Sequence, residues 1–210
     1  MPHSTTLTSP TYNAPHVQDF LHITWRHRRN FLDPKRDLSL GSIPMGHQVL
    51  IAAMAYTVTN LHRPDMDYSN KQDYSAMQRM TSLDDDGRVT AIDILERLKA
   101  NNANLALIWY LRFCRRFLQL FIAHHISVEQ KIVLAGYILG SLAIWKRQIE
   151  LTPGLTLKKN FMTSETFQDT IIAVSNFVLL MRLLNIMLGR EVYREVYREV
   201  YREVYREGGI

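Results

Sequence analysis

The chain has 210 residues, of which 47% are hydrophobic and 21% are charged, a composition typical of globular proteins. This length accommodates one domain with a buried core. The formal net charge of +5 and the sequence pI of about 9.4 favour an anionic partner. The single cysteine, Cys114, excludes an internal disulfide framework and indicates a reducing, intracellular compartment. The first ten residues also lack the basic and apolar regions of a secretory signal peptide.

Two apolar segments approach the length of a membrane-spanning helix. Residues 132–145 are uncharged over 14 positions, but a spanning helix needs about 17–25 residues. Residues 105–123 are long enough, yet they carry three arginines near their centre, and each costs about 2.5–3.5 kcal/mol in a bilayer. We therefore expect both segments to be helices of a soluble core, and we expect no membrane partner.

The N-terminal part of the chain contains few regular elements. Residues 1–15 are rich in Ser, Thr and Pro and are expected to form a disordered lead-in. A short strand is allowed near Val17. Residues 33–47 include two prolines and two glycines, which indicate a loop. Residues 48–61 are predicted to form a short apolar helix, which a second loop follows.

Two helices are predicted in the middle of the chain. Ser82 and Asp85 are spaced like a capping pair, ahead of apolar residues that recur at helical spacing as far as Leu98. Asparagines at positions 101, 102 and 104 then interrupt the pattern, and a long helix resumes at Leu105. We expect its polar stripe to be an exposed edge or to pair with the aspartates at positions 84–86. The stripe consists of Arg112, Arg115, Arg116 and Gln119.

A second long helix is predicted to begin at a capping box formed by Ser127 and Gln130. It is almost wholly apolar, and the Pro-Gly pair at positions 153–154 ends it. Gly136 and Gly140 lie one turn apart in this helix. We therefore expect another helix to approach it closely there.

The last helix is predicted to be capped by Thr163 or Ser164, and a repetitive tail of residues 189–210 follows it. In this tail the unit Glu-Val-Tyr-Arg occurs four times without variation. As a helix it would place Glu near Arg at i+3, worth about 0.2–0.5 kcal/mol per pair. Such a repeat is typical of a short-repeat expansion or a shifted reading frame, and the alternative is an assembly helix. No run of alternating residues predicts a sheet.

The fold class predicted from these elements is mainly α. We expect an irregular bundle of about five or six helices over residues 16–188, with a short N-terminal strand and the repetitive C-terminal tail.

A dense basic and aromatic run is the most informative stretch of the chain. Arginine and lysine neutralise phosphates, while aromatic rings stack on bases or sugars, so the run predicts a nucleic-acid interface. The alternative interpretation is a solvated helix face. The six residues predicted to bind nucleic acid are Trp25, Arg26, Arg28, Arg29, Lys35 and Arg36, and Phe31 lies among them.

The other candidate sites do not match the residue patterns of metal-binding or catalytic sites. His16, Asp19 and His22 are spaced by three, but residues six apart on a helix point about 240° away from each other, so no metal site is predicted there. The aspartates at positions 84–86 lack the Gly and Glu of a calcium loop. Cys114 lies among apolar residues and is expected to be buried and unreactive. Sequence chemistry alone does not indicate an enzyme or a cofactor.

A series of short motifs occurs in order between about residues 18 and 180. The first is Gln-Asp, followed by His-Ile, two arginines at alternate positions and an apolar pair. Later motifs are Lys-Gln-Asp-Tyr, a Ser-to-Ile helix start, Leu-Ala-Ile-Trp-Lys and Lys-Asn-Phe-Met-Thr; the five occupy residues 18–32, 71–74, 127–132, 142–146 and 159–163. Together they resemble the internal region of transposon-derived proteins of the P-element/THAP type.

This resemblance implies that Asp19 is one carboxylate of an RNase H-like transposase site, where it would bind Mg²⁺. It also implies that Arg26 and Arg28 lie near a DNA backbone. Two-metal chemistry needs several carboxylates, and the family's earlier Asp and final Glu have no counterpart in this chain. Arg29-Asn30 departs from the expected Asn, and residues 174–177 lack the family's His. The resemblance therefore implies a catalytically inactive fragment, with Mg²⁺ bound only if another chain completes the acidic site.

The expected function is DNA binding by a transposase-derived fragment, and a DNA partner would place it in the nucleus. The alternative is a helical protein-interaction or oligomerisation module with no nucleic-acid role, in which chains self-associate through the tail. A third interpretation is an unproductive open reading frame whose product does not accumulate as folded protein.

Overall fold

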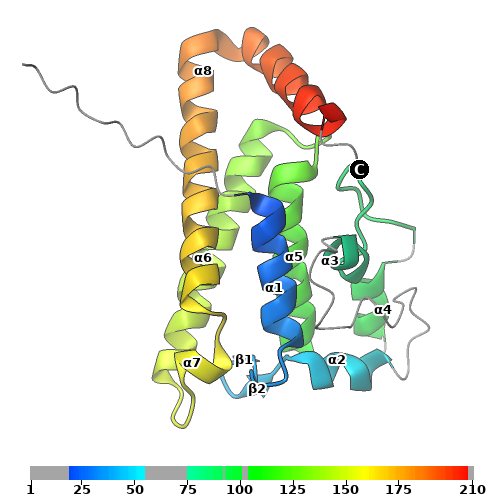
Figure 1. Ribbon diagram of the computed structural model, residues 1–210, viewed down its shortest axis with the longest axis vertical. Helices are drawn as coiled ribbons and strands as arrows, with labels where there is room; N and C mark the ends of the chain where they lie inside the picture. Colours follow the sequence, from blue (N-terminus) through cyan, green and yellow to red (C-terminus); the bar gives the residue numbers. More distant parts are fainter. Residues whose placement is uncertain (1–18, 55–74, 92, 101–103, 208–210) are drawn as a thin grey trace, which may run out of the picture.

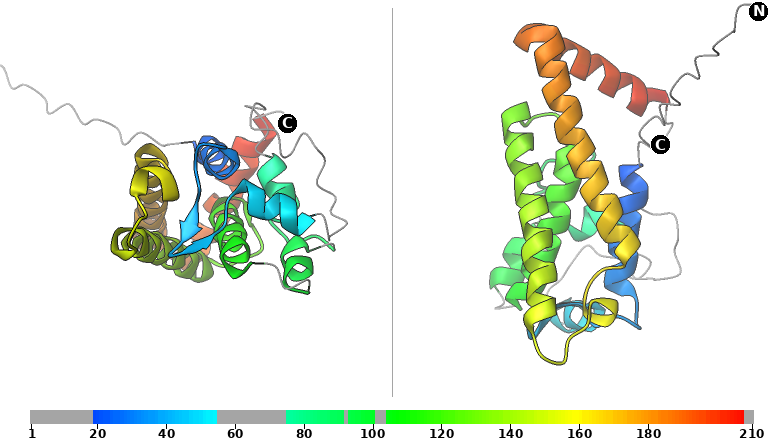
Figure 2. Two further views of the ribbon diagram at one scale, coloured as in Figure 1. Left: turned by 90° about the horizontal axis from the view of Figure 1, so that it is seen from below. Right: turned by 90° about the vertical axis from the view of Figure 1, so that its left-hand side faces the viewer.

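The computed structural model of the chain describes residues 19–54, 75–91, 93–100 and 104–207. These ranges contain eight helices and one two-stranded antiparallel sheet (Figures 1 and 2). The predicted mainly α fold is confirmed, with more short helices than the five or six expected. The elements are α1 (Phe20–Leu32), β1 (Ser39–Leu40), β2 (Ile43–Pro44), α2 (His47–Met54), α3 (Ser75–Met80), α4 (Ile94–Ala100), α5 (Leu105–Ile122), α6 (Val128–Leu151), α7 (Leu157–Asn160) and α8 (Ser164–Glu207).

Helices α1, α5, α6 and α8 enclose an aromatic core. In Figure 1, α1 lies between α5 and α8, and α6 packs against both α5 and α8. Tyr110, Phe113 and Phe117 of α5 are fully buried. The ring of Phe31 from α1 stacks on Tyr110 at 5.2 Å, and Trp145 from α6 meets Tyr110 edge-on at 5.9 Å. Because each buried large apolar side chain contributes about 1.5–3 kcal/mol, these rings hold the bundle together.

The hairpin of β1 and β2 closes one end of the bundle (Figure 2). The indole N–H of Trp145 donates to the carbonyl of Ser39 at 2.7 Å. The side chain of Asn104 caps α5 by accepting from the N–H of Ala106 at 2.8 Å, and its amide donates to the carbonyl of Pro44 at 2.7 Å. The segment predicted as a loop therefore contains a short hairpin that is anchored to α5 and α6.

Two of the predicted helix starts are confirmed. The Ser127 hydroxyl accepts from the N–H of Gln130 at 3.3 Å, and the Gln130 side chain accepts from the N–H of Ser127 at 2.7 Å. Thr163 precedes α8, and its hydroxyl accepts from the N–H of Thr166 at 3.2 Å. Helix α6 ends at Leu151, just before the predicted Pro-Gly pair. These ends are set by side chains close in sequence, which is why local patterns found them.

The prediction that Ser82 caps a helix directly after it in the sequence is wrong. Ser82 has a positive φ of 57°, and a turn follows it instead of a helix. The turn is closed by a bridge between Leu83 and Val89. Helix α4 begins only at Ile94, whose N–H donates to the Ser82 hydroxyl at 2.8 Å. Ser82 thus caps a helix twelve residues away, because the turn brings that helix back to it.

The close helix approach predicted at Gly136 and Gly140 is also wrong. Both glycines are exposed, and no neighbouring atom lies within 4 Å of the position where a Cβ would stand. The core side of α6 is instead formed by Ile138, Leu142 and Trp145, which are fully buried. The glycines lie on the side of α6 away from the core.

The polar stripe of α5 has a partner that the sequence pattern missed. Arg115 forms a bidentate ion pair with Asp93, with the Nη1–Oδ2 distance 3.0 Å, and does not pair with the aspartates at 84–86. Burial alone would raise the pKa of Asp93, but the hydrogen bond and charge of Arg115 outweigh it and lower that pKa. Arg116 lies over the ring of Tyr137, 3.7 Å from its centre. The pair with Asp93 joins α5 to the start of α4.

Several predictions fall outside the described residues. These are the disordered lead-in, the strand near Val17 and the part of the predicted apolar helix that follows α2. At the other end, α8 continues as a helix into the repeat and turns across the top of the bundle (orange to red in Figure 1).

Among the residues that the structure describes, two helices are long and apolar enough to cross a membrane by length and composition alone. They are α6 and the first 21 residues of α8, residues 164–184. In these segments 33% and 22% of the residues of the most apolar window are buried. Helices in the core of soluble proteins can meet the same criterion.

Candidate functional site

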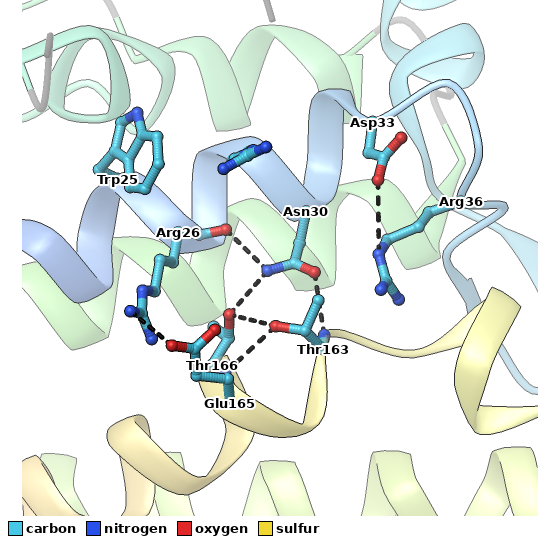
Figure 3. Close-up of a pocket in the computed structure, with 9 residues that line it drawn as sticks. Trp25, Arg26, Asn30, Asp33, Arg36, Thr163, Glu165 and Thr166 are labelled. Atoms are coloured by element: carbon cyan, nitrogen blue, oxygen red, sulfur yellow. Dashed lines mark hydrogen bonds and ion pairs between the residues drawn. The ribbon is translucent and has the colours of Figure 1, made fainter. Parts of the chain in front are cut away.

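A cavity of about 300 Å³ opens between the second half of α1 and the start of α8 (Figure 3). Four of the six residues predicted to bind nucleic acid line it. They come from α1 and from the loop after it, while the opposite wall is formed more than a hundred residues later in the chain. The lining consists of Trp25, Arg26, Arg29, Asn30, Asp33, Arg36, Thr163, Glu165 and Thr166.

Asn30 fixes the two walls of this cavity against each other. Its Oδ1 accepts from the N–H of Thr163 at 2.9 Å. Its Nδ2 donates to the Thr166 hydroxyl and to the carbonyl of Arg26, both at 2.8 Å (Figure 3). Sequence reasoning did not select Asn30, although a polar residue between buried positions of a helix is a signal for a specific hydrogen bond.

Arg26 bridges α1 to two carboxylates of α8. Its Nη2 lies 2.8 Å from Oε1 of Glu165, and its Nη1 is paired with Asp169. The side chain of Glu165 is 70% exposed, whereas that of Asp169 is 14% exposed. Asp169 therefore holds Arg26 in place. Glu165 pairs with the outer nitrogen of the guanidinium, where an incoming anion would bind.

Arg29 and Trp25 form the outer wall of the cavity. Arg29 is exposed, and its guanidinium carbon lies 5.3 Å from the centre of the Trp25 ring. Positions 25 and 29 are one helical turn apart, so both side chains project from the same side of α1. This pair presents a positive charge beside an aromatic surface.

Arg36 reaches the cavity from the loop after α1. Its Nη1 donates to the carbonyls of Lys158 and Phe161, each at 2.9 Å, and its Nε lies 3.6 Å from Oδ2 of Asp33. These contacts hold the guanidinium beside the start of α8. Lys35 is exposed but does not line the cavity.

Arg28 is placed differently from its neighbours. Only 1% of it is exposed, so a nucleic acid cannot reach its side chain in this structure. The reason is helical geometry: Arg28 is two residues, about 200°, from Arg26 on α1 and therefore points to the opposite side. A contact by Arg28 would require its side chain to leave this buried position.

Asp19 caps α1 and lies outside the cavity. Its Oδ1 accepts from the N–H of Leu21 at 2.9 Å, and the residue is exposed. Across the part of the chain that the structure describes, no three His, Cys, Asp or Glu side chains gather closely enough to hold a metal ion. Cys114 is buried as predicted, and burial raises the pKa of its thiol to about 12, which disfavours the reactive thiolate.

The cavity combines three arginines, an aromatic ring and the first turn of a long helix, whose N–H groups carry a partial positive charge. Two carboxylates, Asp33 and Glu165, partly offset the arginines. Such an arrangement can bind an anionic group next to a flat ring. No protein-family model matches this sequence, and no curated protein or solved structure matches it either.

Proposed function

We propose that this protein binds nucleic acid and that the arginine cavity between α1 and α8 is its phosphate-binding site. The observation that carries the proposal is the convergence of Arg26, Arg29 and Arg36 beside Trp25. Phosphate contacts supply most of the affinity of such proteins, and an aromatic ring adds stacking. The net charge of +5 favours the same partner.

The proposal includes descent from a transposase and no cleavage activity of the chain by itself. The motif that resembles transposon-derived proteins supplies Arg26 to the cavity. Its acidic member, Asp19, acts as a helix cap at the other end of α1. A nuclear location follows from this proposal if the nucleic acid is chromosomal DNA.

The test is binding of the full chain to a labelled oligonucleotide over a range of salt concentrations. We expect the affinity of the Arg29→Ala variant to fall and the slope of log K against log salt to decrease by about 0.7–0.9, the contribution of one phosphate. Arg88→Ala is the matched control, because Arg88 is exposed and pairs with Asp86 away from the cavity. Equal loss in both variants, or no binding by the wild-type chain at low salt, would contradict the proposal.

A second function, self-association through α8, is favoured by a different observation. Five large apolar residues in the described part of α8 are 44–79% exposed, and Leu180 is one of them; the other four are Ile172, Leu179, Leu183 and Ile186. Their spacings of seven, four and three residues place them in one stripe, opposite the buried Val174 and Met181. In the sequence, Gly189 and Arg190 follow this stripe, so the apolar spacing does not continue directly into the repeat. The stripe therefore covers two heptads, residues 172–186.

We assign this stripe to a second copy of the chain. Analytical ultracentrifugation of the full chain should show a dimer that the Leu179→Gln/Leu183→Gln variant weakens at least tenfold. Leu105→Gln is the control, because Leu105 is 77% exposed at the start of α5 and lies outside the stripe. A monomeric wild-type chain at high concentration, or binding of the wild type but not the variant to lipid vesicles, would contradict this assignment.

A further inference from the structure

A second cavity of about 340 Å³ adjoins the first at the start of α8. The two cavities share Arg36 and Thr163. The second one extends from there toward α6 and α7. Its lining consists of Arg36, Lys146, Leu157, Lys158, Phe161, Met162, Thr163, Ser164 and Phe167.

The second cavity differs from the first in its chemistry. Its lining contains three cations and no carboxylate. Phe161 and Phe167 meet edge-on with their ring centres 5.4 Å apart, and Lys146 Nζ lies 5.2 Å from the centre of the Phe167 ring. The Phe167 ring is half-buried, so a flat ring can stack on the part of it that Lys146 leaves open, beside positive charges that attract a phosphate.

Arg36 stands at the junction of the two cavities. The carbonyls of Lys158 and Phe161 hold its guanidinium, so a phosphate bound there meets a charge that is already in position. One aromatic surface lies on each side of this junction, Trp25 in the first cavity and Phe167 in the second. This order of ring, cation and ring matches the order of base, phosphate and base along a nucleic-acid strand.

We infer that the two adjoining cavities bind single-stranded nucleic acid, with one phosphate at Arg36 and the two flanking bases stacked on Trp25 and Phe167. The inference rests on the proposed nucleic-acid function and specifies its substrate. In a duplex the bases are stacked and paired inside the helix, so their faces cannot enter two separate cavities. An unpaired strand can turn its bases outward onto protein rings. The cavities therefore favour a single strand over a duplex.

The test compares three labelled probes on the full chain: a deoxythymidine oligonucleotide, an abasic strand of the same length, and a duplex. We expect the single strand to bind most tightly. The abasic strand, which keeps the phosphates and loses the bases, should bind about 5- to 10-fold more weakly, since stacking supplies part of the affinity. Thymidine monophosphate should compete only at much higher concentration, because it fills one cavity at a time.

Phe167→Leu is the deciding variant, because leucine retains apolar bulk against Phe161 while removing the ring. It should lower affinity for the single strand about 5- to 10-fold and leave duplex affinity unchanged. Lys146→Gln keeps the side chain long and removes the positive charge beside Phe167, so it should reduce single-strand binding in the same direction. A thermal melt of each variant verifies folding.

Tighter binding of the duplex, equal binding of the abasic strand, or competition by the mononucleotide at oligonucleotide concentrations would overturn the inference. The first two results would leave the proposed phosphate site intact if Arg29→Ala still weakens binding. No binding of any probe would overturn both proposals together.

Discussion

Glu165 forms an ion pair with Arg26 at 2.8 Å, at the edge of the cavity that we assign to phosphate. The carboxylate lies where an anionic ligand would approach Arg26, and 70% of its side chain is exposed. A ligand phosphate therefore competes with an acidic side chain of the protein itself. Because exposed ion pairs contribute only about 0–1 kcal/mol, the competition is weak.

Replacing Glu165 with glutamine should strengthen nucleic-acid binding. The substitution removes the competing charge and keeps the size of the side chain, so we expect affinity at low salt to rise about 2- to 5-fold, the scale of one exposed ion pair. The measurement is fluorescence anisotropy on a labelled oligonucleotide. Glu96→Gln is the control, because Glu96 forms a similar exposed pair with Lys99 on α4. An equal gain from both variants would show a general charge effect without a local site.

Replacing Asn30 with alanine should destabilise the protein. The change leaves the N–H of Thr163 and the Thr166 hydroxyl without the partners that now join α8 to α1. Loss of buried hydrogen bonds of this kind costs about 1–3 kcal/mol. Urea unfolding measures this loss of unfolding free energy, and Asn176→Ala on the partly exposed side of α8 is the control. If both variants unfold at the same urea concentration, Asn30 does not hold the two helices together.

The stability of the fold should depend on His27 at acidic pH. His27 is fully buried, its Nε2 lies 3.0 Å from the Thr170 hydroxyl, and its Nδ1 has no hydrogen-bond partner. Burial lowers its pKa from 6.5 to about 3. Between these values the unfolded chain binds a proton that the folded chain does not, so stability falls as pH decreases.

This contribution amounts to at most about 1.4 kcal/mol for each pH unit below 6.5 and stops near pH 3. Other groups also titrate in this range, so the measurement is a difference: unfolding free energy of the wild type against His27→Gln at pH 7, 6, 5 and 4. The variant should lose less stability on acidification. Parallel curves would mean that His27 is protonated in the folded protein.

Two glycine substitutions should have opposite effects on stability. Gly87 has a φ of +72°, and a Cβ there would lie 3.0 Å from backbone atoms of Ala123. Gly87→Ala should therefore destabilise the fold by more than about 1 kcal/mol. Gly140→Ala meets no atom within 4 Å on the exposed side of α6 and should stabilise the fold by about 0.5–1 kcal/mol. Thermal melts of both variants test these two predictions. A loss of stability in Gly140→Ala would show that other atoms pack against this side of α6.

Local sequence patterns predicted those features that depend on neighbours along the chain. The capping box at Ser127 and the cap at Thr163 were found because each involves residues three positions apart. The helical period places Trp25, Arg26 and Arg29 on one side of α1, although the prediction from the sequence included Arg28 with them. The burial of Arg28 follows from the same geometry, since the helical period places it about 200° from Arg26.

The sequence by itself thus determined the mainly α fold, most long helices and the basic, aromatic side of α1. Tertiary structure alone decided which residues face that side. Thr163, Glu165 and Thr166 reach it across more than 130 residues of chain, and Ser82 caps a helix that a turn returns to it. The physical reason is that helix formation depends on contacts within one turn, whereas a cavity depends on how separate helices pack. Packing is set by the whole buried core, and no local pattern encodes it.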